Sequence, residues 1–232
     1  MGKRIIQQAR GKGSFTYRVR RSAFQYKIGY PMNKGNALIL DLIHSAGHSA
    51  PLMKLKIADE IFYNPAFNKA VVGDEIKIGS NESKTGNILP INEIPSGTSI
   101  YNIERNPGDG GKMIRTAGSS AVILKKLENN KVSVLMPNKK SIILSGYCRA
   151  TIGTIAGDGR KLKPIMKAGR RFHRMRAIGK LYPRTSAVKV NAVDHPFGSG
   201  RGKRIKSKIA KRNAPAGRRV GHIRPRRTGK PK

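Results

Sequence analysis

Short runs of apolar residues, separated by glycine, proline and asparagine, fill the middle of this 232-residue chain. Runs of this length and spacing are typical of the strands of an all-β sandwich or barrel. Two of these runs flank Pro137, Asn138 and Lys139, which are typical turn residues, so we predict a β-hairpin over residues 132–144. The helical signal is weak throughout. The predicted strands cover residues 37–43, 52–58, 75–79, 100–103, 121–127, 132–136, 141–144 and 151–156.

The segment from Asn106 to Gly111 interrupts this series of strands. Its sequence is Asn-Pro-Gly-Asp-Gly-Gly. Proline restricts the backbone φ angle and glycine permits positive φ, and both are typical of turns. We therefore expect a boundary near residues 95–110. Apolar residues make up 38% of the chain, which is enough for small cores but thin for a single large one. Two small β-barrels of about 60 to 70 residues each fit these limits.

Charge divides the chain further. The net charge is +36, and residues 1–34 hold nine basic residues and no acidic one, while residues 164–232 hold 22 basic residues and one acidic. Residues 35–95, in contrast, have a net charge of −2. The excess of basic over acidic residues in the two ends predicts a polyanionic partner. The ends are also rich in glycine and proline, so we expect them to be disordered until RNA or DNA orders them.

Composition also narrows the class of protein. No apolar run approaches the 18 to 20 or so residues that cross a bilayer, so no membrane partner is expected. The N-terminal sequence lacks the apolar stretch of a secretory signal. The single cysteine, Cys148, forms no internal disulfide and is expected in the core. These features predict an intracellular, cytoplasmic protein.

Basic and aromatic residues alternate in both ends. Arg18, Arg20 and Arg21 lie among phenylalanines and tyrosines, and four arginines surround Phe172 and His173. Cationic side chains neutralise phosphates and planar ones stack on unpaired bases, a combination suited to structured RNA. The alternative is a solvated charged surface. Glycine beside arginine, as at Gly169–Arg171, lets the backbone approach a phosphate closely, or makes a flexible linker.

Two possible ligand sites fail their templates. The loop Gly108–Lys112 suggests a phosphate loop, but Asn106 stands in place of the first glycine and Met113 in place of Ser or Thr. His44 and His48 are four residues apart, yet their segment is predicted as strand and loop and lacks a third ligand. We therefore expect neither a metal nor a cofactor.

The most enzyme-like stretch is Asn191–Gly198, because it contains adjacent Asp194 and His195. Pro196 favours an extended His195, and neighbouring side chains of an extended chain point in opposite directions. Asp194 is thus poorly placed to orient the His195 ring, and a histidine that contacts RNA is preferred to a catalytic one.

Five motifs carry a family resemblance. In order along the chain they are Pro107–Lys112, Cys148–Gly153, Lys167–Arg170, Asn191–Gly198 and Arg212–Arg218. Together they resemble the universal large-subunit ribosomal protein family conventionally numbered two. The start, from Met1 to Ile5 with Arg10–Gly13, is similar to the archaeal and eukaryotic branch, and the short length favours an archaeal source.

This resemblance implies an all-β fold in which an OB-like barrel (35–95) precedes an SH3-like barrel (96–165). Basic extensions (1–34 and 166–232) would thread large-subunit ribosomal RNA. The expected function is structural, on the cytoplasmic ribosome, in subunit association, tRNA placement and support of the peptidyl-transferase region. Expected partners are that RNA, neighbouring ribosomal proteins and the small subunit. No enzymatic activity is expected.

The resemblance also places Asp194, His195 and Pro196 near the peptidyl-transferase centre, although Ser199 interrupts the family's glycine run. The alternatives are a general nucleic-acid compaction protein and direct catalysis by His195. The expected RNA-binding residues are Lys3, Arg4, Arg10, Lys12, Arg18, Arg20, Arg21, Arg149, Arg160, Lys161, Lys163, Lys167, Arg170, Arg171, His173, Arg174, Arg176, Arg201, Lys203, Arg204, Arg212, Arg218 and Arg219.

Overall fold

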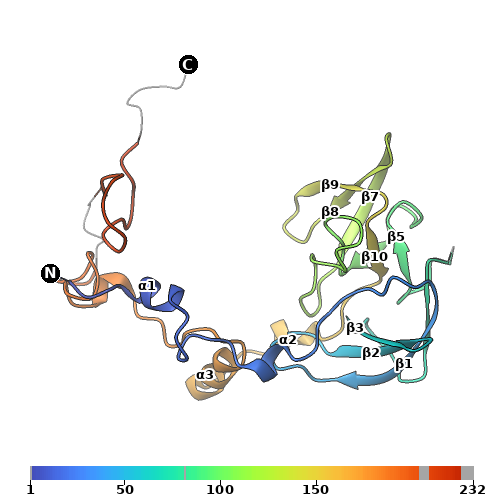
Figure 1. Ribbon diagram of the computed structural model, residues 1–232, viewed down its shortest axis with the longest axis horizontal. Helices are drawn as coiled ribbons and strands as arrows, with labels where there is room; N and C mark the ends of the chain where they lie inside the picture. Colours follow the sequence, from blue (N-terminus) through green and yellow to red (C-terminus); the bar gives the residue numbers. More distant parts are fainter. Residues whose placement is uncertain (1, 81, 204–208, 226–232) are drawn as a thin grey trace. The chain divides into compact units, whose positions relative to one another are not determined.

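The computed structural model describes residues 2–80, 82–203 and 209–225. Contacts group the chain into two compact units (Figure 1). Residues 20–167 form the larger unit, here called the barrel unit. Residues 1–19 together with 168–232 form the second, here called the extension unit. The barrel boundary at 95/96 falls inside the barrel unit and stays a prediction, whereas residues 20–34 group with the barrels.

The described part of the barrel unit has ten strands in a single hydrogen-bonded series. Their order is β3-β2-β1-β4-β5-β10-β6-β7-β8-β9, and neighbours are antiparallel except for the parallel pair β4–β5. This architecture confirms the predicted all-β class. The strands are β1 (Gly35–Ile43), β2 (Leu52–Ile57), β3 (Glu60–Pro65), β4 (Glu75–Ile78), β5 (Ile88–Pro90), β6 (Ser99–Tyr101), β7 (Ala121–Leu127), β8 (Lys131–Leu135), β9 (Ser141–Ser145) and β10 (Arg149–Ile152).

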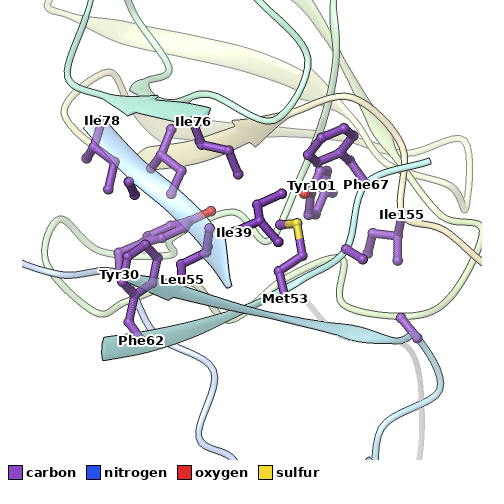
Figure 2. Close-up of a cluster of buried hydrophobic side chains, with 14 of the residues drawn as sticks. Tyr30, Ile39, Met53, Leu55, Phe62, Phe67, Ile76, Ile78, Tyr101 and Ile155 are labelled. Atoms are coloured by element: carbon purple, nitrogen blue, oxygen red, sulfur yellow. The ribbon is translucent and has the colours of Figure 1, made fainter. Parts of the chain in front are cut away.

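The first core lies inside strands β1 to β4. Figure 2 shows Ile39 of β1 and Met53 of β2 directed toward Tyr101, which enters from β6. Tyr30 precedes β1 and is buried in the same core. Its hydroxyl donates to the Asn102 carbonyl at 2.6 Å, so the polar end of this ring is satisfied inside the barrel. The chain just before β1 thereby becomes part of the barrel wall.

The second core is built by strands β5 to β10. Ile100, Ile123 and Val134 fill it together with Leu89 of β5. Cys148 is fully buried there, which confirms its predicted place in the core. Each core is a separate apolar cluster, in agreement with the expectation of two small barrels.

Most of the strands were predictable. The hairpin predicted for residues 132–144 is confirmed, since β8 and β9 pair antiparallel from Lys131↔Ser145 to Leu135↔Ser141. The segment predicted as residues 151–156 is shifted, because β10 spans Arg149–Ile152. Strands β3 and β5 were not predicted.

The expectation of weak helical signal is wrong for α3 (Ala168–Ala177). Its Arg, Met and Ala residues have high helix propensity, but it buries no side chain and so shows no apolar stripe. No described helix is long and apolar enough to span a membrane. The remaining helical segments are α1 (Ile6–Gly11), η1 (Arg21–Phe24), α2 (Gly159–Leu162) and η2 (Ala187–Lys189).

Candidate nucleic-acid interface

Helix α3 carries a dense basic cluster of the extension unit. Arg170, Arg171, His173 and Arg176 are exposed, while Arg174 is half-buried. The Arg171 guanidinium carbon lies 5.4 Å from the centre of the Tyr182 ring. Tyr182 was missed by sequence reasoning because 11 residues separate it from Arg171. The pair presents a planar cation backed by an aromatic ring, which suits both phosphates and base faces.

A similar pair lies in the N-terminal segment. The Arg18 Nε atom donates to the Gly13 carbonyl at 2.8 Å, and the guanidinium carbon is 5.3 Å from the Phe15 ring centre. The Phe15 side chain is 90% exposed. An aromatic ring this exposed, held beside a positioned cation, can stack on an unpaired base. The other predicted residues of this end are also exposed: Lys3, Arg4, Arg10, Lys12, Arg20 and Arg21.

Residues 210–224 form a closed loop. The Ala210 amide donates to the His222 carbonyl at 2.8 Å, and the Arg224 amide donates to the Ala210 carbonyl at 3.0 Å. Arg219 donates from Nε and Nη2 to the Ala214 carbonyl, which fixes its direction. Arg212 and Arg218 on this loop are exposed, as are Arg201 and Lys203 before it. Arg204 lies outside the described residues.

The two basic ends of the chain lie against each other within the extension unit. The Lys3 amide donates to the Val193 carbonyl at 2.8 Å. A Cβ atom at Gly217 would lie 2.5 Å from Gln8 Oε1, and one at Gly179 would lie 2.6 Å from Val19 Cγ2. Segments of the same sign are therefore held side by side. Their mutual repulsion is relieved only by anions, because Asp194 is the single acidic residue of this unit.

The His195 ring is oriented by backbone and not by Asp194. The Phe197 amide donates to His195 Nδ1 at 3.0 Å, so the neutral ring carries its proton on Nε2. Burial lowers the pKa of His195 below its usual value. Among the described residues, no hydrogen bond joins Asp194 to this ring. Asp194, His195 and Pro196 are all half-buried.

Ser199 takes the backbone shape of a glycine. Its φ is +73°, in the left-handed region, and its amide donates to the Val190 carbonyl at 3.1 Å. Gly198 beside it is a true glycine position, since a Cβ there would lie 2.2 Å from the Asn191 carbonyl oxygen. The path expected of a glycine run is thus kept, at the cost of local strain at the serine.

Arg149, expected to bind RNA, is used inside the barrel unit. Its backbone amide, Nε and Nη2 donate to the Glu104 carboxylate at 2.8 to 3.1 Å. Nη1 donates to the Pro31 carbonyl at 2.6 Å, and the guanidinium carbon is 5.3 Å from the Tyr30 ring centre. Glu104 is fully buried. These contacts hold the guanidinium inside the barrel unit, which argues against a role for Arg149 in binding RNA.

The glycine loop after Glu104 has its amides turned inward. Gly108 and Gly110 donate to the Glu104 carboxylate at 3.2 and 3.1 Å. Arg105, Asn106 and Gly111 donate to Asp109. A phosphate loop needs these amides for its ligand, and here carboxylates hold them. Sequence reasoning missed Glu104, although an acidic residue directly after the apolar run 100–103 was a signal.

The barrel unit contributes further basic residues near its C-terminal end. Arg160, Lys163 and Lys167 have exposed side chains, and the side chain of Lys161 is not among those that the structure describes.

His48, a candidate metal ligand, contacts Ser45 Oγ through Nδ1 at 2.7 Å and packs edge-on against Phe24. In the described part of the chain, no cluster of three metal-ligating residues is found.

Comparisons with known proteins agree with the family resemblance. The family model described as "Ribosomal Proteins L2, C-terminal domain" matches residues 84–217. Relatives named "Large ribosomal subunit protein uL2" come from Methanococcus maripaludis (42% identical, 99% of this chain and 100% of the relative) and Methanocaldococcus jannaschii (43%, 99% of each). Another is from Archaeoglobus fulgidus (41%, 99% of each). All three organisms are archaea, as the N-terminal sequence predicted. The chain belongs to the family of ribosomal proteins L2.

Proposed function

We propose that this chain is a structural protein of the large ribosomal subunit whose basic extensions bind large-subunit ribosomal RNA. The observation that carries this proposal is the extension unit, in which two cationic segments lie together around few buried apolar side chains. Among its described residues, these are Ile5, Phe197 and Ala210. So small a core does not offset both chain entropy and like-charge repulsion. In this proposal a folded polyanion supplies the missing stabilisation, and family membership supports ribosomal RNA as that polyanion.

The contacts divide by type. Arginines 170, 171, 174 and 176 of α3 neutralise phosphates, and Phe15 and Tyr182 stack with their arginine partners beside unpaired bases. Arg160, Lys163 and Lys167 dock the barrel unit on RNA. Residues 35–95, loops included, have a net charge of −2, so in this proposal they face solvent, protein or the small subunit.

The segment 190–199 reaches toward the peptidyl-transferase region in this proposal. His195 donates from Nε2 while its Nδ1 accepts from Phe197, so the ring offers the RNA a donor and no free base. This geometry favours an RNA contact over general-base catalysis. Support of tRNA placement and of subunit association follows from the position of such a segment and not from any chemical step at His195.

The salt dependence of RNA binding tests the proposal. Replacing Arg170, Arg171, Arg174 and Arg176 by glutamine removes four charges from α3, and the control replaces Lys125, Lys126, Lys139 and Lys140 of the second barrel. The slope of log K against log salt should become shallower by about 0.7 to 0.9 for each lost phosphate contact, for the α3 variant only.

The assay measures the affinity of the full chain for a folded large-subunit RNA fragment and for duplex DNA at matched salt. A large preference for the folded RNA is expected. Equal affinity for DNA would favour a general compaction protein. Equal slopes for the two variants would show that α3 is not the phosphate-binding element.

A further inference from the structure

The loop of residues 190–199, here called the His195 loop, is closed by its own backbone. The Ser199 amide donates to the Val190 carbonyl at 3.1 Å and joins the two ends of the loop. Inside it, the His195 amide donates to the Asn191 carbonyl at 3.3 Å and forms a turn. Because the loop is tied together in this way, a contact that fixes its turn also fixes the place of the His195 ring.

The N-terminal segment holds this turn through its main chain. Val193 lies between Asn191 and His195, and its carbonyl accepts the Lys3 amide at 2.8 Å. Gly2 packs on the same carbonyl, since a Cβ atom at Gly2 would lie 3.0 Å from its oxygen. Among the described residues, no ion pair joins the two segments. The backbone therefore makes the contact, and the Lys3 side chain stays exposed and open to phosphate.

A second contact ties the same segment to the closed loop of residues 210–224. A Cβ atom at Gly217 would lie 2.5 Å from Gln8 Oε1, so the Gln8 side chain rests on the Gly217 backbone. The same oxygen accepts from the Ile5 amide at 3.1 Å, and the Ile5 side chain is buried. Residues 2–8 thus contact two separate loops of the C-terminal end.

We propose that residues 2–8 position the His195 loop and the 210–224 loop on ribosomal RNA, an inference that rests on the proposed function. The RNA relieves the repulsion between the cationic segments, and the Lys3–Val193 hydrogen bond fixes the direction in which the His195 loop meets it. A loop that is already held in place loses less conformational entropy when it binds. Lys3 thus acts twice, through its amide on the protein and through its ammonium group on the RNA.

Directed cleavage of RNA in the assembled particle tests this assignment. The full-length chain carries Ala192→Cys, an exposed position, labelled with an iron–EDTA reagent that releases hydroxyl radicals. Cys148 is fully buried and so is shielded from the reagent. Large subunits that contain the labelled chain are purified, and the cleaved nucleotides are mapped. Lys3→Pro removes the amide donor, so cleavage at the original nucleotides should weaken about three- to tenfold and spread to their neighbours.

Lys3→Ala is the comparison variant, because it loses the same charge and keeps the amide. The excess effect of proline over alanine reports the hydrogen bond to Val193 and not a lost phosphate contact. Equal cleavage patterns in the two variants would overturn the proposal. A proline variant that cleaves like the unsubstituted Lys3 chain would overturn it as well.

A label at Phe172→Cys in α3 separates this proposal from the proposed function. RNA cleavage from position 172 supports RNA binding by α3, and its absence would count against the proposed function itself. With that cleavage present, its pattern should be the same with Lys3 and with Lys3→Pro. A change from position 172 as large as that from position 192 would overturn the positioning proposal alone, because proline would then disturb the whole extension unit.

The contact at Gly217 has its own test, read from a label at the exposed position Asn213→Cys. Gly217→Ala pushes the Gln8 side chain away from the Ile5 amide, so cleavage from position 213 should weaken about threefold. The matched control is Gly200→Ala, since Gly200 also has positive φ, +93° against +86°, but nothing lies within 4 Å of its Cβ position. Equal weakening in both variants would show backbone strain alone and would overturn the role of Gln8.

Discussion

The barrel unit and the extension unit differ in what stabilises them. The barrel unit has two apolar cores and buries the Glu104 side of the Glu104–Arg149 ion pair, whose carboxylate accepts five hydrogen bonds. The described residues of the extension unit bury three apolar side chains and are joined by backbone hydrogen bonds between like-charged segments. We therefore expect the barrels to fold by themselves, whereas the extensions depend on charge supplied by a partner.

Limited proteolysis gives the largest contrast. Trypsin should cut the RNA-free chain within residues 1–19 and 168–232 on the order of a hundredfold faster than within 20–167, because local opening is nearly free in the extensions. Folded ribosomal RNA should remove this difference, while duplex DNA at matched salt should protect less. Extensions that resist trypsin without RNA would contradict the comparison.

The buried ion pair should dominate the stability of the barrels. Glu104→Gln leaves the partly buried Arg149 without its counter-charge, so the free energy of unfolding should fall by about 3 to 5 kcal/mol. Denaturation of the full chain, followed by circular dichroism, measures the loss.

The matched control is Glu82→Gln, which breaks the exposed Lys77–Glu82 pair (2.8 Å). Its unfolding midpoint should not move, because water already solvates both groups. A similar loss in the two variants would mean that the Glu104 network has no special role. Neither change should alter the tryptic pattern of the extensions.

The same contrast explains which strands the sequence could predict. Strands β7, β8 and β9 are short apolar or alternating runs separated by clear turn residues, so the sequence pattern found them. Strand β3 reads Glu-Ile-Phe-Tyr-Asn-Pro, and its Asn64 is buried against Thr151 and Asn102. A buried polar residue breaks the alternation of buried apolar and exposed polar positions. The hydrogen-bond partners that allow its burial are distant in sequence, so the sequence pattern does not reveal them. Strand β5 has only three residues and ends on Pro90, and a proline in a short apolar run argues against a strand.

The candidate interface was predictable where charge alone decides. The exposed arginines of α3 follow from composition, but the helix itself does not, because it has no buried stripe. In the sequence, Arg149 could not be told from the other basic residues predicted to bind RNA. It differs from them because it pairs with Glu104, which is 45 residues away along the chain. Pairings of this kind are fixed by the fold. The stacking of Tyr182 on Arg171 was hidden for the same reason.

Two strained residues offer a smaller test of the comparison. Ala58 in the turn between β2 and β3 and Ser199 in the extension both have positive φ, +47° and +73°. Glycine relieves the strain at each position but loosens the unfolded chain, for a net gain of about 0.5 to 1 kcal/mol. Ala58→Gly should raise the free energy of unfolding of the barrels. Ser199→Gly should leave it unchanged and strengthen RNA binding two- to fivefold or so.

The smallest expected effect is a pH dependence of the barrels. Burial, and then the nearby Arg115 charge, lower the pKa of His48 below its usual 6.5. The unfolded chain therefore binds a proton at pH values where the folded barrel does not. The His48 contribution to stability is present above pH 6.5 and is lost as the pH falls through the lower folded-state pKa. Between pH 7.5 and 5.5 the barrel unfolding midpoint should decline, and His48→Gln should flatten that decline. His195→Gln is the matched control, since its ring lies in the extension unit, and an equal flattening there would contradict the separation of the two units.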